Sequence, residues 1–180
     1  YIISGPSSGC KAIILKLFIE KNGFNRVVPF TSRERRIHEN EIEGKEYFFR
    51  EKEELWKISK NFTLGYWDFP FGHVYGYTSD IKDAILSKHN HIILATTKIA
   101  LAIKNDYRNV TICFIDFKTN EELEKRITDR FKPNKNFIKE KLLNAITERK
   151  NKNNFDIKLE EDNPFRLYDE LAKLISPLKL

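Results

Sequence analysis

The sequence predicts an α/β protein in which helices cover both faces of a parallel β-sheet. Short apolar segments alternate along the chain with segments of helical periodicity, and this alternation is typical of parallel sheets. The chain has 180 residues, of which 41% are hydrophobic and 32% charged, which is enough for one domain with a full core. A segment rich in aromatic residues and glycine, 41–77, interrupts the alternation and predicts short antiparallel strands.

Strands are expected where short β-branched and aromatic runs are bounded by turn residues. The runs His91–Thr96 and Val110–Phe117 are mostly apolar, as in strands that are buried on both faces. In chain order, the core strands are expected at residues 1–4, 27–30, 91–96, 110–117 and 155–159.

Helices are expected where apolar residues recur at intervals of three and four behind a capping residue. Leu15 and Ile19 share one face of the first helix. Thr119 followed by Glu122 forms a capping box, and Asp80 lies near the positive end of another helix. In chain order, the helices are expected at residues 11–20, 51–60, 79–87, 98–103, 119–130, 137–150 and 164–175.

Composition narrows the classes of function. The net charge of +6 suits an anionic partner, but the basic residues are spread along the chain, so nucleic acid is not the expected one. No run approaches the roughly 18 apolar residues of a membrane span, and no signal segment is visible. Cys10 and Cys113 are the only cysteines, which excludes a disulfide framework and predicts a reduced, cytoplasmic protein.

The turn before the first helix resembles a phosphate-binding loop. It reads Gly5-Pro6-Ser7-Ser8-Gly9-Cys10-Lys11-Ala12. The full pattern is G-x-x-x-x-G-K-[ST], whose backbone N–H groups and lysine hold phosphates. Gly5 and Lys11 fall at the right spacing, Cys10 replaces the second glycine, and Ala12 replaces the hydroxyl residue that would hold Mg²⁺. We expect an ATP phosphate loop with a weakened capacity for Mg²⁺.

Five segments resemble motifs of the guanylate kinase family, and they occur in family order over nearly the whole chain. Tyr1–Ser7 is similar to the family's opening strand and loop, and Thr31–Arg36 to its T-T-R-x-x-R motif. Glu41–Phe49 resembles E-x-x-G-x-D-Y-x-F, and Tyr75–Thr78 resembles Y-G-[ST]. Glu122–Arg130 is similar to the lid segment with its R-x-x-x-R spacing. Each motif alone is weak, but together they are specific.

The resemblance implies a three-layer P-loop fold with a parallel core sheet, an inserted substrate-binding subdomain of short antiparallel strands and a helical lid. A single guanylate kinase-like domain is expected over residues 1–180. The core would comprise residues 1–32, 78–122 and 150–180, the insert residues 33–77, and the lid residues 123–149.

The resemblance also implies a clamp for the phosphate of a monophosphate substrate. The matching residues are Arg33, Arg36, Tyr47 and Tyr75. Guanidinium groups bind phosphate in a bidentate manner, and phenols donate directed hydrogen bonds, so the chemistry is coherent. The alternative is a set of solvated arginines and buried tyrosines without a ligand. The loop between Arg36 and Glu41 is two residues longer than in the family.

The residues that read guanine in the family are replaced in this chain. Pro29 stands where the family has a serine, and Tyr66 where it has a carboxylate that accepts from the base. Asp68 would lie on the same side of a strand as Tyr66 and is the candidate substitute. With Thr97, these residues form the expected base pocket. Losing hydrogen bonds built for a polar base edge weakens selection for guanine.

The groups for phosphoryl transfer are also reduced. The family's acidic pair after the third core strand would fall at Ala95 and Thr97, and a third lid arginine is Lys141, which lacks the bidentate fork. Each such loss costs about 10²-fold when a preorganised stabilising group is removed. The expected catalytic residues are Lys11, Arg126 and Arg130.

Three functions are consistent with these residues. The first is a guanylate kinase-like protein that binds a phosphomonoester, with weak or lost ATP:GMP phosphotransferase activity. The second is an active nucleoside monophosphate kinase with altered base choice, which would use ATP and Mg²⁺, the metal being held mainly by the nucleotide because no protein ligand is expected. The third is a phosphopeptide-binding module, since Pro29 is common in the guanylate kinase-like domains of membrane-associated scaffolds.

Overall fold

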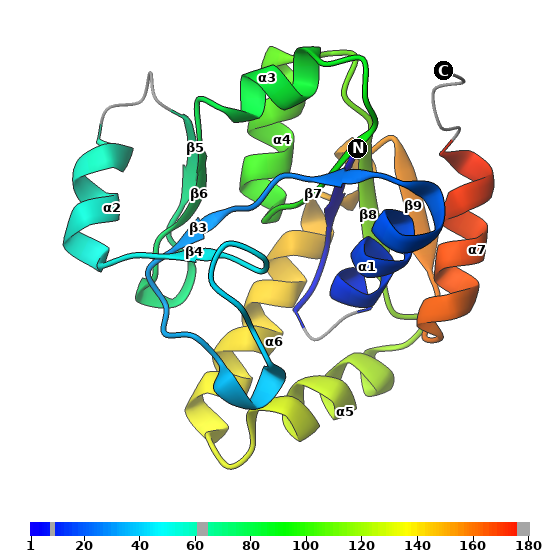
Figure 1. The fold of residues 1–180 in the computed structure, drawn as a ribbon. Helices are drawn as coiled ribbons and strands as arrows, with labels where there is room; N and C mark the ends of the chain where they lie inside the picture. Colours follow the sequence, from blue (N-terminus) through cyan, green and yellow to red (C-terminus); the bar gives the residue numbers. More distant parts are fainter. Residues whose placement is uncertain (8–9, 61–64, 176–180) are drawn as a thin grey trace.

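The core of the protein is a five-stranded parallel sheet with helices on both faces (Figure 1). The computed structural model describes residues 1–7, 10–60 and 65–175. Each pairing between neighbouring core strands is parallel, which confirms the α/β fold class. In the order in which they lie in the sheet, the strands are β2 (Asn25–Arg26), β7 (His91–Leu94), β1 (Ile2–Ser4), β8 (Ile112–Asp116) and β9 (Ile157–Glu160).

Two apolar clusters hold the helices against this sheet. Successive residues of a strand point to opposite faces. Ile3 therefore belongs to the cluster shared with α1 (Lys11–Asn22) and α7 (Pro164–Leu174), and Ile2 to the cluster shared with α4 (Thr97–Asp106). Both isoleucines are fully buried. The packing fixes β1, and with it the phosphate loop that follows β1.

A second sheet of four short strands lies beside the core, on the left of Figure 1. Its strands β3 and β4 pair in parallel, whereas β3–β6 and β5–β6 are antiparallel. The expectation of an antiparallel insert was therefore wrong for one pairing. In spatial order, the strands are β4 (Phe48–Phe49), β3 (Phe30–Thr31), β6 (Tyr75–Thr78) and β5 (Gly65–Asp68).

The predicted core strand 27–30 was wrong, because residues 27–29 belong to no strand and lie between the two sheets. β2 ends at Arg26 in the core, and β3 begins at Phe30 in the small sheet. Pro29 lies between them and has no N–H to donate to a ladder. Its carbonyl oxygen still accepts a hydrogen bond from the N–H of Phe48 at 2.9 Å. Residues 27–29 therefore lead the chain from the core sheet to the small sheet.

The two helices of the predicted lid, α5 (Asn120–Phe131) and α6 (Lys135–Lys150), form a hairpin, and α5 lies at the bottom of the molecule in Figure 1 while α6 runs upward from it. They share an apolar cluster around Ile127 and Ala145. Thr119 caps α5 as predicted, since its hydroxyl oxygen accepts from the N–H of Glu122 at 3.2 Å. The reciprocal half of the capping box was wrong, because the Glu122 carboxylate accepts from Nε of Arg126 at 2.5 Å.

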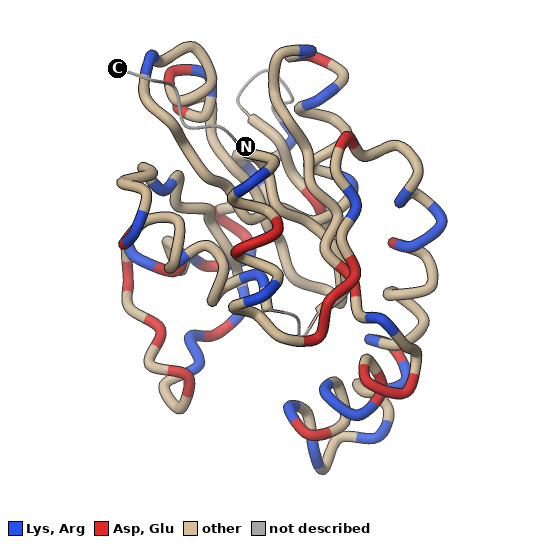
Figure 2. The backbone as a smooth tube through the Cα atoms, turned by 90° about the vertical axis from the view of Figure 1, so that its right-hand side faces the viewer, with Lys and Arg blue, Asp and Glu red and all other residues tan. Residues whose placement is uncertain are grey.

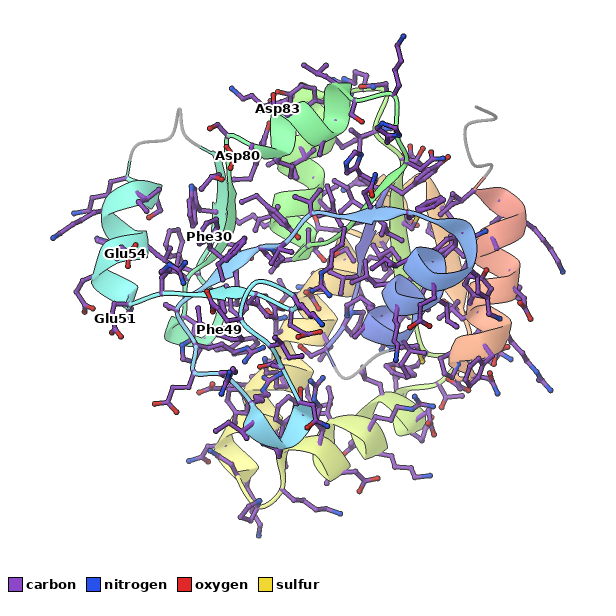
Figure 3. All side chains as sticks on the ribbon, viewed as in Figure 1. Phe30, Phe49, Glu51, Glu54, Asp80 and Asp83 are labelled. Atoms are coloured by element: carbon purple, nitrogen blue, oxygen red, sulfur yellow. The ribbon has the colours of Figure 1, made fainter. Side chains whose placement is uncertain are left out.

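The short helices α2 (Lys52–Ser59) and α3 (Ile81–Leu86) begin with acidic residues. Figure 3 labels Glu51 and Glu54 at α2 and Asp80 and Asp83 at α3. A negative charge near the N-terminus of a helix stabilises it by about 0.3–1 kcal/mol. Asp80 occupies the N-cap of α3 as predicted, but among the described residues its side chain accepts no capping hydrogen bond, so it acts through its charge.

Basic and acidic residues are scattered along the chain in Figure 2, and residues 120–150 include both signs. The net charge of +6 is therefore not gathered in a single stripe in that view. Among the described residues, no helix has the length and apolar character that a membrane span requires.

Candidate active site

Most of the predicted site residues line one cavity between the core sheet, the small sheet and the lid hairpin. This central cleft has a volume of about 1280 Å³. The predicted residues that line it are Gly5, Ser7, Lys11, Ala12, Pro29, Arg33, Arg36, Tyr47, Asp68, Tyr75, Thr97 and Arg130. The described predicted residues outside its lining are Pro6, Cys10, Tyr66 and Arg126. Ser8 and Gly9 lie outside the described residues.

The phosphate loop passes directly against the end of β8. Gly5 has a φ of 128°, and a side chain there would collide with the carbonyl oxygen of Ile115, so only glycine fits. Lys11 lies in the first turn of α1, and its Nζ donates to the carbonyl oxygens of Gly5 at 2.7 Å and Pro6 at 2.5 Å. Burial lowers the pKa of Lys11 to about 8. A bound anion would take over these hydrogen bonds and raise the pKa of Lys11 again.

Cys10 and Arg126 support the loop from outside the central cleft. Cys10 is 3% exposed, and burial raises the pKa of its thiol, so the thiol is a packed group. Arg126 donates from Nη1 to the Cys10 sulfur at 3.6 Å and from Nη2 to the carbonyl oxygen of Asp162 at 2.7 Å. The structure therefore places Arg126 beside the loop, and a bound ATP would have to draw it inward.

Arg33 is held by the carboxylate of Glu41, which was predicted only as part of a motif. The Arg33 guanidinium donates to both oxygens of Glu41, with Nη1 at 2.7 Å from Oε2. Burial lowers the pKa of Arg33, but the hydrogen bonds that it donates to Glu41 outweigh burial and raise the pKa overall. Glu41 also accepts from the backbone N–H of Arg36 at 2.8 Å. One buried carboxylate thus orients both arginines of the predicted clamp.

The two predicted tyrosines adjoin this pair. The Arg33 guanidinium carbon lies 4.9 Å from the centre of the Tyr47 ring. The rings of Tyr47 and Tyr75 meet edge to face, with 6.1 Å between their centres. Tyr75 belongs to β6, whereas Tyr47 precedes β4, so the small sheet brings them together. All four side chains of the predicted clamp line the central cleft.

The second clamp arginine meets the lid. Glu39 ends the 3₁₀ helix η1 (Ile37–Glu39) and accepts two hydrogen bonds from the lid residue Arg130, at 2.9 and 2.7 Å. It also accepts from Nη1 of Arg36 at 3.4 Å. Glu39 was not predicted, because nothing in the local sequence distinguishes one acidic residue of a charged loop as a site residue.

The residues of the expected base pocket divide between two environments. Asp68 lines the cleft, and its Oδ1 lies 3.8 Å from Nζ of Lys98. Tyr66 instead donates its hydroxyl hydrogen to Asp106 at 2.7 Å, at the end of α4. Burial and Asp106 raise the pKa of Tyr66. The Thr97 hydroxyl lies 3.3 Å from that of Ser4.

The lid helix α6 contributes two further titratable groups to the cleft. Nζ of Lys141 lies 3.5 Å from the centre of the Phe71 ring and 4.8 Å from that of Phe137. Burial, followed by the charge of Arg36, lowers the pKa of Lys141 to about 7. Glu148 has a buried Oε2 without a hydrogen-bond partner among the described residues, and burial raises its pKa to about 7. Glu148 was not predicted.

Two positions at which the family resemblance implies oxygen groups for Mg²⁺ carry alanine in this chain. Ala12 follows the loop lysine and offers no oxygen, and Ala95 offers none at the end of β7. Among the described residues, no three His, Cys, Asp or Glu side chains gather as a metal site.

Comparison with known proteins agrees with this arrangement. The sequence model of the family described as guanylate kinase matches residues 1–178. The guanylate kinase of Mycoplasma mobile is 35% identical over 97% of this chain and 90% of its own length. The guanylate kinase of Clostridium tetani is 36% identical over 72% of this chain and 62% of its own length.

The fold has a match among solved structures. The crystal structure of guanylate kinase from Anaplasma phagocytophilum superposes with a TM-score of 0.76, over 96% of this chain and 82% of that one. Its sequence identity is 20%, so this likeness concerns the fold alone. The sequence match over residues 1–178, the 35% identity to a full-length relative and the shared fold lead to one conclusion. The chain belongs to the guanylate kinase family.

Proposed function

We propose that the protein binds a nucleoside monophosphate and ATP in the central cleft and transfers the γ-phosphoryl group slowly, with weak selection for guanine. Membership of the family implies the nucleotide substrates, ATP with Mg²⁺ and a monophosphate. The observation that carries the proposal is the convergence of Arg33, Arg36, Tyr47 and Tyr75 in the cleft that Lys11 also lines.

Each of these residues has a distinct role in the proposed reaction. Arg36 and the two tyrosines bind the monophosphate, and Arg33 adds charge from a fixed position. Lys11 binds the phosphates of ATP and neutralises charge on the transferring group, and Arg130 approaches the same group from the lid. Because phosphoryl transfer depends on positioning and charge neutralisation, such a set supports in-line transfer from ATP to the monophosphate.

The slow rate in this proposal is supported by the positions where the family resemblance implies oxygen ligands for Mg²⁺. Ala12, Ala95 and Thr97 offer no carboxylate, and only Thr97 has a hydroxyl, which lies beside Ser4. Removing one preorganised stabilising group costs about 10²-fold in rate. Two such losses together lower the rate by about 10⁴-fold if they act independently.

A coupled assay with ATP, Mg²⁺ and a panel of nucleoside monophosphates tests the proposal. We expect measurable formation of nucleoside diphosphate far below the usual kinase range of about 1–100 s⁻¹, with little preference for GMP. A control variant, Lys11→Met, removes the residual rate. Turnover within the usual range on one monophosphate contradicts the slow rate and favours an active kinase with altered base choice.

The relatives reported above are named as kinases, and they lend no support to a phosphopeptide partner. The binding part of the proposal has its own test, since equilibrium dialysis with labelled GMP measures binding without turnover. Absence of GMP binding at millimolar concentration contradicts it.

A further inference from the structure

A carboxylate lies between two arginines that the proposed function assigns to different substrates. Glu39 Oε1 accepts from Nε of Arg130 at 2.9 Å, and Glu39 Oε2 accepts from Nη2 of Arg130 at 2.7 Å. The same Oε2 accepts from Nη1 of Arg36 at 3.4 Å. Both guanidiniums also lie over the Phe131 ring, 5.7 and 5.5 Å from its centre. One side chain therefore ties the lid to the predicted monophosphate clamp.

Glu39 reaches this position through the lengthened loop. It lies between Arg36 and Glu41, where the chain has two residues more than the family motif that it resembles. The next residue, Asn40, has a φ of 54°, which turns the chain sharply after η1. Figure 1 shows this loop extending down to the lid helices. The Glu39 side chain lines the central cleft.

The surroundings keep the carboxylate ionised. Burial raises the pKa of Glu39, but hydrogen bonds and charges from Arg130 and Arg36 outweigh it and lower the pKa overall. His38, an exposed residue, places Nε2 3.9 Å from Oε1. Near neutral pH, Glu39 therefore presents negative oxygens to both guanidiniums, as a phosphate group would.

We propose that Glu39 is an internal competitor for phosphate, which occupies Arg36 and Arg130 in the ligand-free protein and is displaced by the phosphoryl groups of the substrates. This inference rests on the proposed function, because it takes both arginines as phosphate ligands. A phosphate dianion carries more charge and more acceptor oxygens than one carboxylate, so it can displace Glu39 from the arginines. The same contact holds the lid close to the clamp until the exchange takes place.

The binding of GMP and of inorganic phosphate, measured by calorimetry at fixed ionic strength, tests the inference. Glu39→Gln keeps the shape but removes the charge, and we expect it to bind both ligands about threefold to tenfold more tightly. The matched control is Glu43→Gln, in the same segment. Glu43 pairs with Arg50 at 2.7 Å and does not line the central cleft, so its variant should bind as the wild type does.

Hydrogen exchange of α5 gives a second readout. Without ligand, Glu39→Gln should exchange faster than the wild type in the turns around Arg130, because the lid has lost its tether. Added GMP should bring the two proteins to similar exchange, since the phosphate then holds the arginine.

Different results would overturn the competitor role of Glu39 and the proposed function. If Glu39→Gln binds phosphate and GMP as weakly as the wild type or more weakly, while Arg36→Ala weakens GMP binding at least about tenfold, the competitor role is overturned and the proposed function survives. If the wild type does not bind GMP, or if Arg36→Ala binds it normally, the proposed function fails and the inference fails with it.

Discussion

The arginines of the central cleft differ in what holds them, and this difference separates binding from stability. Arg33 is 7% exposed and pairs with a Glu41 side chain that is equally buried. Arg36 is more exposed, and among the described residues its guanidinium donates one hydrogen bond, to Glu39 at 3.4 Å. A buried pair is costly to break from one side, whereas a loosely held guanidinium is available to a ligand.

Replacing Arg36 should therefore affect binding, and replacing Arg33 should also affect stability. Arg36→Ala is expected to weaken GMP binding about 10–100-fold, because it removes charge-assisted hydrogen bonds to phosphate. Its free energy of unfolding should change by less than about 1 kcal/mol. Arg33→Ala should lose about 3 kcal/mol, because Glu41 is left buried and unpaired. Urea denaturation and calorimetry measure both, and equal stability of the two variants would contradict this distinction.

The loop lysine predicts a pH dependence for ATP binding. Lys11 has a pKa lowered to about 8 in the ligand-free protein by burial, and the charged form binds phosphate. Above that pH a proton must be taken up on binding, so the affinity for ATP should fall about tenfold between pH 7 and pH 9. Lys11→Arg keeps its charge and should show a flat profile. A wild-type profile as flat as that of Lys11→Arg would contradict this assignment.

Two residues of the expected base pocket should behave differently. Asp68 lines the cleft, so Asp68→Asn should change the relative KM values of guanine and adenine monophosphates. The Tyr66 hydroxyl bonds to Asp106 at the end of α4, so Tyr66→Phe should leave that ratio unchanged and cost about 1 kcal/mol of stability. A change of base preference in Tyr66→Phe, with none in Asp68→Asn, would reverse the assignment.

The sequence could suggest the arginines, the tyrosines and Glu41 as parts of motifs, but not two further carboxylates of the cleft. Arg33, Arg36, Tyr47 and Tyr75 stood out because their spacing resembles a family motif. Glu39 and Glu148 carry no such signal, since an acidic residue in a polar loop or helix is usually solvated. Only the tertiary contacts of these carboxylates distinguish them.

At the scale of elements, α6 carries an amino group in an apolar setting. Lys141 is 6% exposed, its Nζ faces three phenyl rings, and its pKa is lowered by burial to about 7. Between pH 7 and the pKa of the unfolded chain, the folded state binds fewer protons than the unfolded one. Stability due to this group therefore rises with pH over that range.

Lys141→Met should stabilise the ligand-free protein more at pH 6 than at pH 9. Methionine fills the space between the rings without a charge to desolvate. The gain in free energy of unfolding from Lys141→Met should be about 3 kcal/mol larger at pH 6 than at pH 9, because pH 9 lies two units above the pKa of Lys141. Lys11 and Glu148 also titrate in this cleft, but both variants contain them. Equal stabilisation at both pH values would show that the ammonium is not desolvated in the folded state.

The elements of the core were predictable because local signals and burial agree there. The core helices and most core strands lie within a few residues of their predicted bounds, since apolar periodicity and capping residues mark them. The small sheet was harder to predict. The parallel pairing of β3 with β4 depends on how far the chain travels between Phe30 and Phe48, and two-residue strands have no periodicity to read.

At the scale of the whole molecule, the site exists only because three units meet. The core supplies Lys11, the small sheet and the loop after β3 supply the proposed phosphate clamp, and the predicted lid supplies Arg130. The lid also pairs with the core at its far end, where Arg149 donates to both oxygens of the buried Asp116 at 2.8 Å. The lid is thus anchored at the end of α6, while a substrate phosphoryl group can replace Glu39 as the partner of Arg130.

The most direct test is calorimetric binding of a bisubstrate analogue in which adenosine and guanosine are joined through five phosphates. We expect one molecule of the analogue to bind per chain, in competition with both ATP and GMP. We also expect Lys11→Met and Arg36→Ala each to weaken binding of the analogue by at least about tenfold. Absence of binding, or binding that is unchanged in Arg36→Ala, would contradict the claim that one cleft holds both phosphate-bearing substrates.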